Sequence, residues 1–507
     1  MDTMNLNITR YCLEQWACDN STASKPAFTF ARKNKKNDTW TYQEVWNLVQ
    51  SIGKGYIKLG LKKGDRVLIR LPHSPEYAFA FFGANIAGLI PIPASPQLTN
   101  EEASFLLEDS GATCIVQSST AQPFNFKGIT IEDKNLLHMN GEKELPFTKS
   151  EDPGFLIYTS GTTAKPKGVL HAQRTVLGRA FMRKGWQDFQ KQDITMHAGT
   201  LNWSYTLGVG LLDAWAVGAH ATLQESPIEP DEWPEIIERL KINVFSAVPT
   251  IFRQILKYSE IEKYDLSALR HVLCGGEPLT PALYEEWESR TNTKIHEALG
   301  MTELSTYISS SPTITTRIGS PGKPQLGRNI AILPEDSDST EPVPPNEIGL
   351  LASHRSDPGL MLGYWNRPQE ESAVFRGDWF IGGDRAAMDT DGYIWFHGRA
   401  DDVIKSFGFR LSPVEIEAVL ESHPEVSEAA VIGYQLDESK TLVTACIVPV
   451  ENHDINEQNL KIFATEHLAE YKQPHQYKFF KSLPRTKNGK LQRSVLLKSL
   501  HEASKNL

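Results

Sequence analysis

Residues 154–168 read GFLIYTSGTTAKPKG, an apolar run that passes directly into a loop rich in glycine, small hydroxyl residues and lysine. In such a loop, glycines let backbone N–H groups approach anionic oxygens closely, hydroxyls add hydrogen-bond donors, and lysines add positive charge. The loop is therefore suited to binding a polyphosphate. Its spacing is not that of a Walker A loop. The alternative, from composition alone, is a flexible surface loop with solvated lysines.

Short apolar strands alternate with helical patterns on both sides of this loop, through residues 1–400. Arg66–Leu71 is typical of a strand, and Ser74-Pro75 marks the start of the helix that follows it. Thr99–Glu102 has the pattern of a capping box, which predicts the start of another helix. Thr113–Val116 has the pattern of a further short strand. This alternation predicts an α/β fold of layered sheets and helices.

The pattern changes after the strand that ends near residue 400, and we place a domain boundary there. Asp391-Gly392 predicts the hairpin turn whose returning strand leads to this boundary. Beyond it, Ser412–Glu415 predicts a helix cap, and Asn456–Leu468 is helical in pattern. We therefore predict a large domain over residues 1–400 and a small α+β domain over residues 401–507.

Length, charge and cysteine content limit the kinds of partner and the cellular compartment that we expect for this protein. The chain has 507 residues, more than one hydrophobic core usually organises. With 52 basic and 62 acidic residues its formal net charge is -10, so we expect no nucleic-acid partner. The five cysteines lack the spacing of metal ligands, which favours a reducing compartment. The first residues do not have the pattern of a signal peptide, so we expect a cytoplasmic protein.

The most apolar stretch, Tyr77–Pro93, resembles a membrane span in hydropathy only. Two glycines, an asparagine and two prolines interrupt it, and it is short for a bilayer. We interpret it as a buried helix that runs into a strand, and we expect no stable membrane insertion.

SGTTAKPKG, at residues 160–168, resembles the phosphate loop of the acyl-adenylate-forming (ANL) superfamily, which comprises acyl-CoA synthetases, nonribosomal peptide adenylation domains and luciferases. Further segments resemble this superfamily, in its order, along essentially the whole chain. The resemblance implies a large N-terminal domain of layered α/β subdomains with a β-barrel-like part, and a small mobile α+β C-terminal domain. It implies that the ATP phosphates are bound by Thr159, Ser160, Gly161, Thr162, Thr163, Lys165, Lys167 and Arg410.

Two later segments resemble the superfamily's nucleotide-binding segments. GGEP at 275–278 resembles the turn on the adenine side, and EALGMTE at 297–303 resembles the second segment. The resemblance implies that Thr302 binds the α-phosphate and that Glu303 helps to hold the Mg2+ ion. Both are expected to be catalytic residues. Adenine is then expected to contact Gly276, Glu277, Pro278, Glu297, Ala298, Leu299, Gly300 and Met301. The superfamily commonly has an aromatic residue where this chain has Leu299.

The remaining functional positions lie towards the C-terminus. Asp384 in FIGGD and Arg399 in GRADD resemble the two residues that bind the ribose hydroxyls. Asp401 resembles the hinge residue about which the small domain turns, and Gly408 lies on the segment that lines the CoA tunnel in relatives. Lys490, in PRTKNGK, resembles the catalytic lysine that bridges the acid's carboxylate and the phosphate oxygens.

The acyl pocket is expected within Leu201–His220, which is closest to the corresponding segment of benzoate-type and medium-chain ligases. Trp203 and Tyr205 are its candidate walls, although they could equally be core aromatics. Gly300 stands where acetate- and propionate-specific relatives carry a tryptophan, and a glycine there favours a larger acid. The predicted pocket residues are thus Trp203, Tyr205 and Gly300.

The resemblance implies an AMP-forming acid:CoA ligase with Mg2+, ATP and CoA. A carboxylic acid, aromatic or of medium chain length, would be converted with ATP to acyl-AMP and pyrophosphate, and then to acyl-CoA. One alternative is transfer of the acyl group to the phosphopantetheine of a carrier protein, although the chain carries no carrier domain after Lys490. The other alternative is a catalytically inactive nucleotide-binding sensor.

Overall fold

The computed structural model describes residues 4–33, 36–121, 126–159, 166–277, 279–402, 404–406, 409–437, 440–450, 455–468, 470–485 and 491–505. The chain divides into two compact units. The first unit comprises residues 1–329 and 353–378, and the second comprises residues 330–352 and 379–507.

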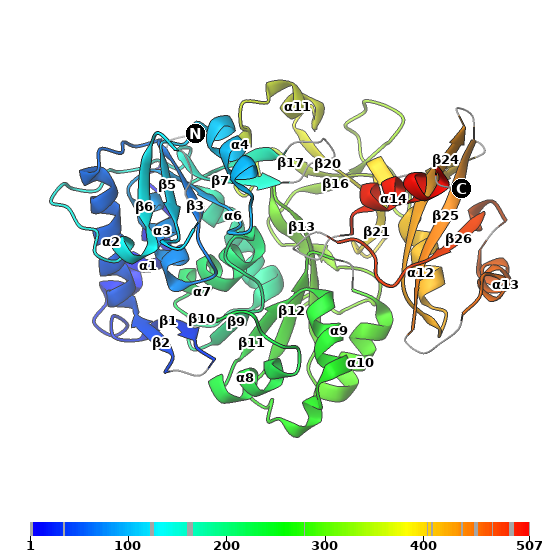
Figure 1. Ribbon diagram of the computed structural model, residues 1–507, viewed down its shortest axis with the longest axis horizontal. Helices are drawn as coiled ribbons and strands as arrows, with labels where there is room; N and C mark the ends of the chain where they lie inside the picture. The colour runs from blue at the N-terminus through cyan, green and yellow to red at the C-terminus, as the bar shows by residue number, and fades with distance from the viewer. Residues whose placement is uncertain are drawn as a thin grey trace. The chain divides into compact units, whose positions relative to one another are not determined.

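The first unit contains most of the helices and strands (Figure 1). They are α1 (Ile8–Ala17), β1 (Pro26–Ala31), β2 (Asp38–Thr41), α2 (Tyr42–Lys58), β3 (Arg66–Arg70), α3 (Pro75–Ile86), β4 (Ile90–Pro93), α4 (Asn100–Ser110), β5 (Cys114–Gln117), β6 (Ile129–Glu132), α5 (Asp133–Leu136), β7 (Pro153–Thr159), β8 (Lys167–Ala172), α6 (Thr175–Met182), η1 (Arg183–Gln187), β9 (Ile194–His197), η2 (Thr206–Leu212), α7 (Asp213–Ala216), β10 (His220–Gln224), α8 (Glu232–Leu240), β11 (Val244–Ala247), α9 (Pro249–Tyr258), η3 (Ile261–Lys263), β12 (His271–Gly275), α10 (Pro281–Thr291), β13 (Ile295–Met301), β14 (Ser305–Ser309), β15 (Lys323–Pro324), β18 (Gly363–Tyr364), α11 (Pro368–Ala373) and β19 (Phe375–Arg376).

The main sheet of the first unit has the strand order β15-β14-β13-β12-β11-β9-β10-β1-β2. Its strands from β1 to β13 along this path pair in parallel. Side chains that alternate along β11 and β12 enter different cores: Val244 and Leu273 face one, and Phe245 and Val272 face the other. Helices α8, α9 and α10 cover the second face (Figure 1). Burial on both faces is what keeps a parallel sheet stable.

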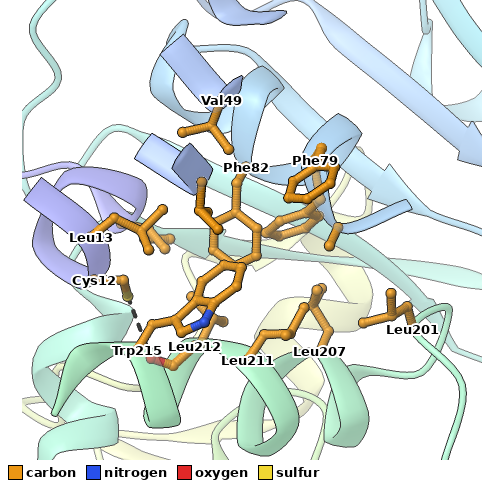
Figure 2. Close-up of a cluster of buried hydrophobic side chains, with 14 of the residues drawn as sticks. Cys12, Leu13, Val49, Phe79, Phe82, Leu201, Leu207, Leu211, Leu212 and Trp215 are labelled. Carbon is orange, nitrogen blue, oxygen red and sulfur yellow. Dashed lines mark hydrogen bonds between the residues drawn. The ribbon is translucent and has the colours of Figure 1, made fainter. Parts of the chain in front are cut away.

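Figure 2 shows part of the core on the first face. Phe82 of α3 and Trp215 of α7 lie with their ring centroids 4.7 Å apart, and both side chains are fully buried. The indole Nε1 of Trp215 donates a hydrogen bond to Ala27 O at 2.8 Å, so its polar atom is satisfied inside the core. Helices α3 and α7 are thereby joined to β1 of the main sheet.

Two smaller sheets complete the first unit. The strands β4-β3-β5-β6 form a parallel sheet, and β18-β8-β7 form an antiparallel one. Leu68 of β3, Ile92 of β4 and Leu156 of β7 share one hydrophobic cluster, so the two sheets pack through a common core. Strands β7 and β8 are the two stems of the glycine-rich loop, and Thr159 pairs with Lys167 where the described stems end.

The second unit contains β16 (Ile330–Leu333), the start of β17 (Gly349–His354), β20 (Trp379–Met388), β21 (Ile394–Arg399), η4 (Ala400–Asp402), β22 (Ile404–Ser406), β23 (Phe409–Leu411), α12 (Pro413–Glu421), β24 (Val426–Asp437), β25 (Lys440–Pro449), α13 (Glu457–His467), η5 (Glu470–Lys472), β26 (Gln476–Phe479) and α14 (Arg493–Lys505). The sheet β24-β25-β26 has α12 and α13 on one face and α14 on the other.

The α/β layering and the smaller α+β part predicted from sequence are confirmed. Thr99 forms the predicted capping box with Glu102, and the Asp391-Gly392 turn joins β20 and β21 as an antiparallel hairpin. The apolar stretch Tyr77–Pro93 is the buried helix α3 followed by β4. Among the described residues, no helix has the length and apolar character needed to cross a bilayer.

Replacing Phe82 by alanine should lower the free energy of unfolding by about 3–5 kcal/mol, because a fully buried ring is lost and a cavity remains. The measurement is the shift of the urea midpoint at constant slope. Phe147→Ala is the matched control, since this ring is 75% exposed, and it should change the free energy by less than about 0.5 kcal/mol. Equal effects of the two substitutions would contradict the packing in Figure 2.

Candidate functional site

The carboxyl ends of the parallel strands gather the predicted nucleotide residues of the first unit. Strand β9 ends at His197, β12 ends at Gly275, and β13 ends at Met301, directly before Thr302. In open α/β sheets this edge is the usual place for ligands. The sequence motifs and the sheet topology therefore indicate the same edge.

The turn that carries Thr302 and Glu303 joins β13 to β14, and hydrogen bonds to its backbone carbonyls hold it in place. His171 Nε2 donates to Thr302 O at 2.9 Å, and Met361 N donates to Glu303 O at 2.8 Å. Ser305, two residues on, has a left-handed φ of 75°, which is uncommon for a residue with a side chain. Both carbonyls of the turn are thus fixed by segments distant in sequence.

The Glu303 side chain is oriented by a tyrosine. Tyr364 Oη donates to Glu303 Oε1 at 2.8 Å. Strand β18, which carries Tyr364, pairs with β8, where Tyr364 lies opposite Val169. The Nζ atom of Lys167 lies 4.8 Å from the centroid of the Tyr364 ring and 3.0 Å from Glu370 Oε2. The stem of the glycine-rich loop and the Thr302–Glu303 turn are therefore brought together.

A magnesium ion fits this arrangement. No group of three or more His, Cys, Asp or Glu side chains converges among the described residues, so there is no protein cage for a metal there. Mg2+ usually needs no such cage: it is held by one or two carboxylates, water and the phosphates of a substrate. Glu303, with Oε1 fixed by Tyr364, supplies a hard oxygen ligand of this kind.

Two buried arginines support the turn from behind. Arg179 forms a bidentate pair with Asp213, at 2.8 and 2.6 Å, and its Nη1 donates to Ser305 Oγ at 2.7 Å. Arg328 donates from Nη1 to Asp357 Oδ2 at 2.6 Å, and from Nη2 to Thr306 O at 2.9 Å. Both arginines therefore bind the start of β14, and through it they fix the turn.

The residues predicted to contact adenine, as far as the structure describes them, lie directly after β12 and within β13. Leu279 N donates to Glu297 Oε1 at 3.1 Å, and Thr250 Oγ1 donates to Glu277 Oε2 at 3.1 Å. Burial raises the pKa of the Glu297 carboxyl to about 7, although the Leu279 N–H acts in the opposite direction. Gly276 has a φ of 93°, which is favourable for glycine alone.

The structure shows why position 300 needs a glycine, which its sequence context did not show. An added Cβ would lie 2.6 Å from Ser305 O and 2.7 Å from Thr306 Cα, next to a register shift in the β13–β14 pairing. Both contacts are with backbone, so neither can move away easily. The glycine is required by the close approach of two strands, and its role in the acyl pocket stays a prediction.

Trp203 and Tyr205 belong to a group of four rings that we call the aromatic cluster: Trp186, His197, Trp203 and Tyr205. Tyr205 lies 4.4 Å from His197, 5.3 Å from Trp203 and 6.0 Å from Trp186, measured between ring centroids. An added Cβ on Gly276 would lie 3.4 Å from the Trp203 ring, and one on Gly275 would lie 3.5 Å from Tyr205. The cluster thus packs against the end of β12.

In the second unit the two predicted ribose residues contact each other. Arg399 Nη1 donates to Asp384 Oδ1 at 3.1 Å and to Gly382 O at 2.7 Å, across the β20–β21 hairpin. Gly383 has a φ of 85°, and an added Cβ would lie 2.9 Å from Arg399 Nη2. Gly383 is therefore fitted closely to this pair.

Several predicted residues lie outside the described part of the chain: Ser160, Gly161, Thr162, Thr163, Lys165, Pro278, Gly408 and Lys490. For Asp401 in η4 and Arg410 in β23 only the backbone is described.

Sequence reasoning missed Tyr364, Glu370, His171 and the two buried arginines. No local pattern marks them, since each acts on a residue far away in the chain.

Comparisons with known proteins agree with this geometry. Residues 13–365 match the family model of the AMP-binding enzymes, and residues 415–490 match the model of their C-terminal domain. The chain is 30% identical to an uncharacterized acyl-CoA ligase of Bacillus subtilis over 503 residues, covering 95% of this chain and 94% of the relative.

Solved structures give the same result. The anthranilate CoA ligase AuaEII, in complex with anthranoyl-AMP, is similar with a TM-score of 0.87 and 27% identity, covering 99% of this chain and 98% of that one. A benzoate CoA ligase from Burkholderia xenovorans is similar with a TM-score of 0.84 and 26% identity, covering 97% and 99% of the two chains.

The buried His171 should make the protein sensitive to mild acid. Burial lowers its pKa from 6.5 to about 3, although its hydrogen bond to Thr302 O acts in the opposite direction. The unfolded chain therefore takes up a proton below pH 6.5 that the native chain does not. Stability is fully present above pH 6.5 and is lost as the pH falls towards 3. Glu297, whose native pKa is raised, acts in the opposite sense between pH 7 and its ordinary value of 4.5.

His171→Gln keeps an N–H donor for Thr302 O but cannot titrate. In urea unfolding between pH 6 and 5, its free energy should fall less steeply than that of the unsubstituted protein, by up to about 1.4 kcal/mol per pH unit. His138→Gln, at an exposed position, is the control and should leave the slope unchanged. A slope for His171→Gln equal to that of the unsubstituted protein would mean that the ring is already charged when folded.

Proposed function

The chain belongs to the family of AMP-binding enzymes and is an AMP-forming acid:CoA ligase, and we propose that the acid it activates is aromatic or of medium chain length. The observation that carries the proposal is the site at the carboxyl edge of the main sheet, where aromatic rings lie beside the predicted nucleotide segments. Two similar structures are ligases of anthranilate and benzoate, which are aromatic acids.

The proposed first half-reaction transfers a nucleotide. A carboxylate oxygen of the acid attacks the α-phosphorus of ATP, the bond to the next phosphate breaks, and pyrophosphate leaves with the electron pair. Because the carboxylate is already a nucleophile, the protein has to position two anions and neutralise their crowded charge. We assign this to the Thr159–Lys167 loop, to Thr302, and to Lys490, which bridges the carboxylate and the phosphate.

Mg2+ would be held by Glu303 together with the phosphates, and it would supply charge neutralisation at the oxygens of the nucleotide. Tyr364 holds Glu303 Oε1 in place for this role. We assign the adenine contacts to Gly276–Pro278 and Glu297–Met301. The support for them is the position of both segments at the strand ends.

The second half-reaction transfers the acyl group to the thiol of CoA. We propose that residues 401–507 act as a lid domain that turns at Asp401 between the two half-reactions, and that Gly408 lines the route of the thiol. Asp384 and Arg399 would bind the ribose, and Arg410 would bind a phosphate. The paired geometry of Asp384 and Arg399 supports the first of these roles.

A phosphopantetheine carrier protein is the second proposed acceptor, since its thiol is chemically the same as that of CoA. We also propose a cytoplasmic location. The support is that all five cysteines are free, four of them buried, which fits a reducing compartment.

The test of function is pyrophosphate release from Mg-ATP with benzoates and with C2 to C12 fatty acids, with and without CoA. Release should need an acid, and thioester should form only when CoA is present. Adenylate that accumulates even with CoA would favour the carrier-protein acceptor, whereas release with no acid dependence would contradict the proposal.

Lys490→Ala should lower acid-dependent pyrophosphate release at least about 100-fold, because a positive charge next to the reacting anions is lost. Lys498→Ala, on exposed surface of α14, is the matched control.

Tyr364→Phe should lower kcat/KM for acid-dependent pyrophosphate release by about 10- to 100-fold, since a hydrogen bond to a charged group contributes about 1.5–3 kcal/mol. The half-saturating Mg2+ concentration should rise, because Glu303 is no longer oriented. Tyr258→Phe, at a side chain that is 57% exposed, is the control. An unchanged Mg2+ dependence would show that Glu303 does not need Tyr364.

A further inference from the structure

The aromatic cluster contains two polar atoms that have no hydrogen-bond partner in the part of the chain that the structure describes. They are Nε2 of His197 and Oη of Tyr205, and both atoms are buried. Native proteins leave few buried polar atoms unpaired, because each one has lost its water without replacement. Two such atoms on rings in contact therefore need an explanation.

The His197 ring has a defined proton. Its Nδ1 accepts a hydrogen bond from Gly199 N at 2.9 Å, so this nitrogen is unprotonated. Burial lowers the pKa of His197 to about 3, which keeps the ring neutral at physiological pH. The single proton is therefore on Nε2, and Nε2 is a donor that has no acceptor among the residues that the structure describes.

Tyr205 contributes a second polar atom, from a ring that contacts the His197 ring. Its ring stands perpendicular to that of His197, with the centroids 4.4 Å apart. Burial raises the pKa of the Tyr205 hydroxyl, so it remains protonated and can both donate and accept. The rest of the cluster is indole surface from Trp186 and Trp203, which accepts no conventional hydrogen bond.

The position of the aromatic cluster favours a bound ligand as the partner of the two unpaired atoms. It lies where β9 and β12 end, at the edge of the sheet where ligands bind in α/β folds. Trp186 and His197 are buried, whereas Trp203 and Tyr205 are only half-buried, so the outer rings can be reached. Another buried hydroxyl without a partner among the described residues, Thr306 Oγ1, belongs to β14 opposite Gly300.

We propose that the acid substrate carries a hydroxyl group on its acyl part, and that His197 Nε2 and Tyr205 Oη bind this hydroxyl. A hydroxyl oxygen accepts from Nε2 while its proton is donated to Oη, so one group satisfies both atoms. The indole faces then contact the apolar remainder of the acid. This inference rests on the proposed function and names the substrate class within it.

The consequence is strong selection by substituent. A site built to hydrogen-bond a substrate hydroxyl rejects the analogue that lacks it, because the polar atoms of the site are then buried unpaired. An aromatic site without such atoms would accept benzoate and a hydroxybenzoate almost equally well. The two cases give different specificity ratios.

The test compares each parent acid with its hydroxylated forms, using pyrophosphate release: benzoate with 2-, 3- and 4-hydroxybenzoate, and octanoate with its hydroxyoctanoates. One hydroxy acid should exceed its parent in kcat/KM by at least about 100-fold. Tyr205→Phe removes one oxygen atom and should reduce this ratio at least about tenfold. Tyr477→Phe is the control: its hydroxyl is also buried without a partner among the described residues, but it lies in β26 of the second unit, so the ratio should not change.

Two results would overturn the inference in distinguishable ways. Turnover of a parent acid at the same efficiency as all its hydroxylated forms would show that the site needs no hydroxyl, as when the Nε2 proton rests against the face of the Tyr205 ring. The proposed function would then stand alone. Absence of acid-dependent pyrophosphate release with every acid would overturn the proposed function and this inference together.

Discussion

The ion pair between Arg179 and Asp213 is the interaction on which the candidate site depends. Both side chains are almost fully buried, at 9% and 2% exposed, and the contact is bidentate. Removing one partner of such a pair leaves an uncompensated buried charge and typically costs about 3–5 kcal/mol. Gln187 Nε2 also donates to Asp213, so the carboxylate is fully engaged.

This pair fixes two parts of the site at once. Through Ser305 Oγ it holds the turn that presents Thr302 and Glu303. Its guanidinium also packs closely against η2, since an added Cβ on Gly208 would lie 2.2 Å from Arg179 Nη2. Tyr205 directly precedes η2, so the aromatic cluster and the Thr302–Glu303 turn share one support. Arg179 therefore contacts both the turn of the expected nucleotide edge and the π-helix that follows the expected acyl-site residues.

Local signals in the sequence were sufficient for several of the elements and for the positions of the motifs. The capping box at Thr99 and the hairpin at Asp391-Gly392 depend only on neighbouring residues, and both were predicted. The π-helical η2 was not predicted; it packs against Arg179, a residue distant in sequence that no local pattern indicates. Tyr364 and its hydrogen bond to Glu303 were missed because the two residues are 61 positions apart in the chain and no local pattern links them. Gly300 was interpreted through its side-chain volume, whereas the structure adds a backbone requirement that no sequence pattern reveals.

The contact between Lys167 and Glu370 has a consequence for anion selectivity. Lys167 already has an internal counter-ion at 3.0 Å, and its ammonium also lies over the Tyr364 ring. An anion that takes Lys167 must compete with a carboxylate that is tethered nearby, and tethering gives that carboxylate a high effective concentration. We therefore expect Lys167 to be bound most readily by an anion that contacts several groups of the site at the same time.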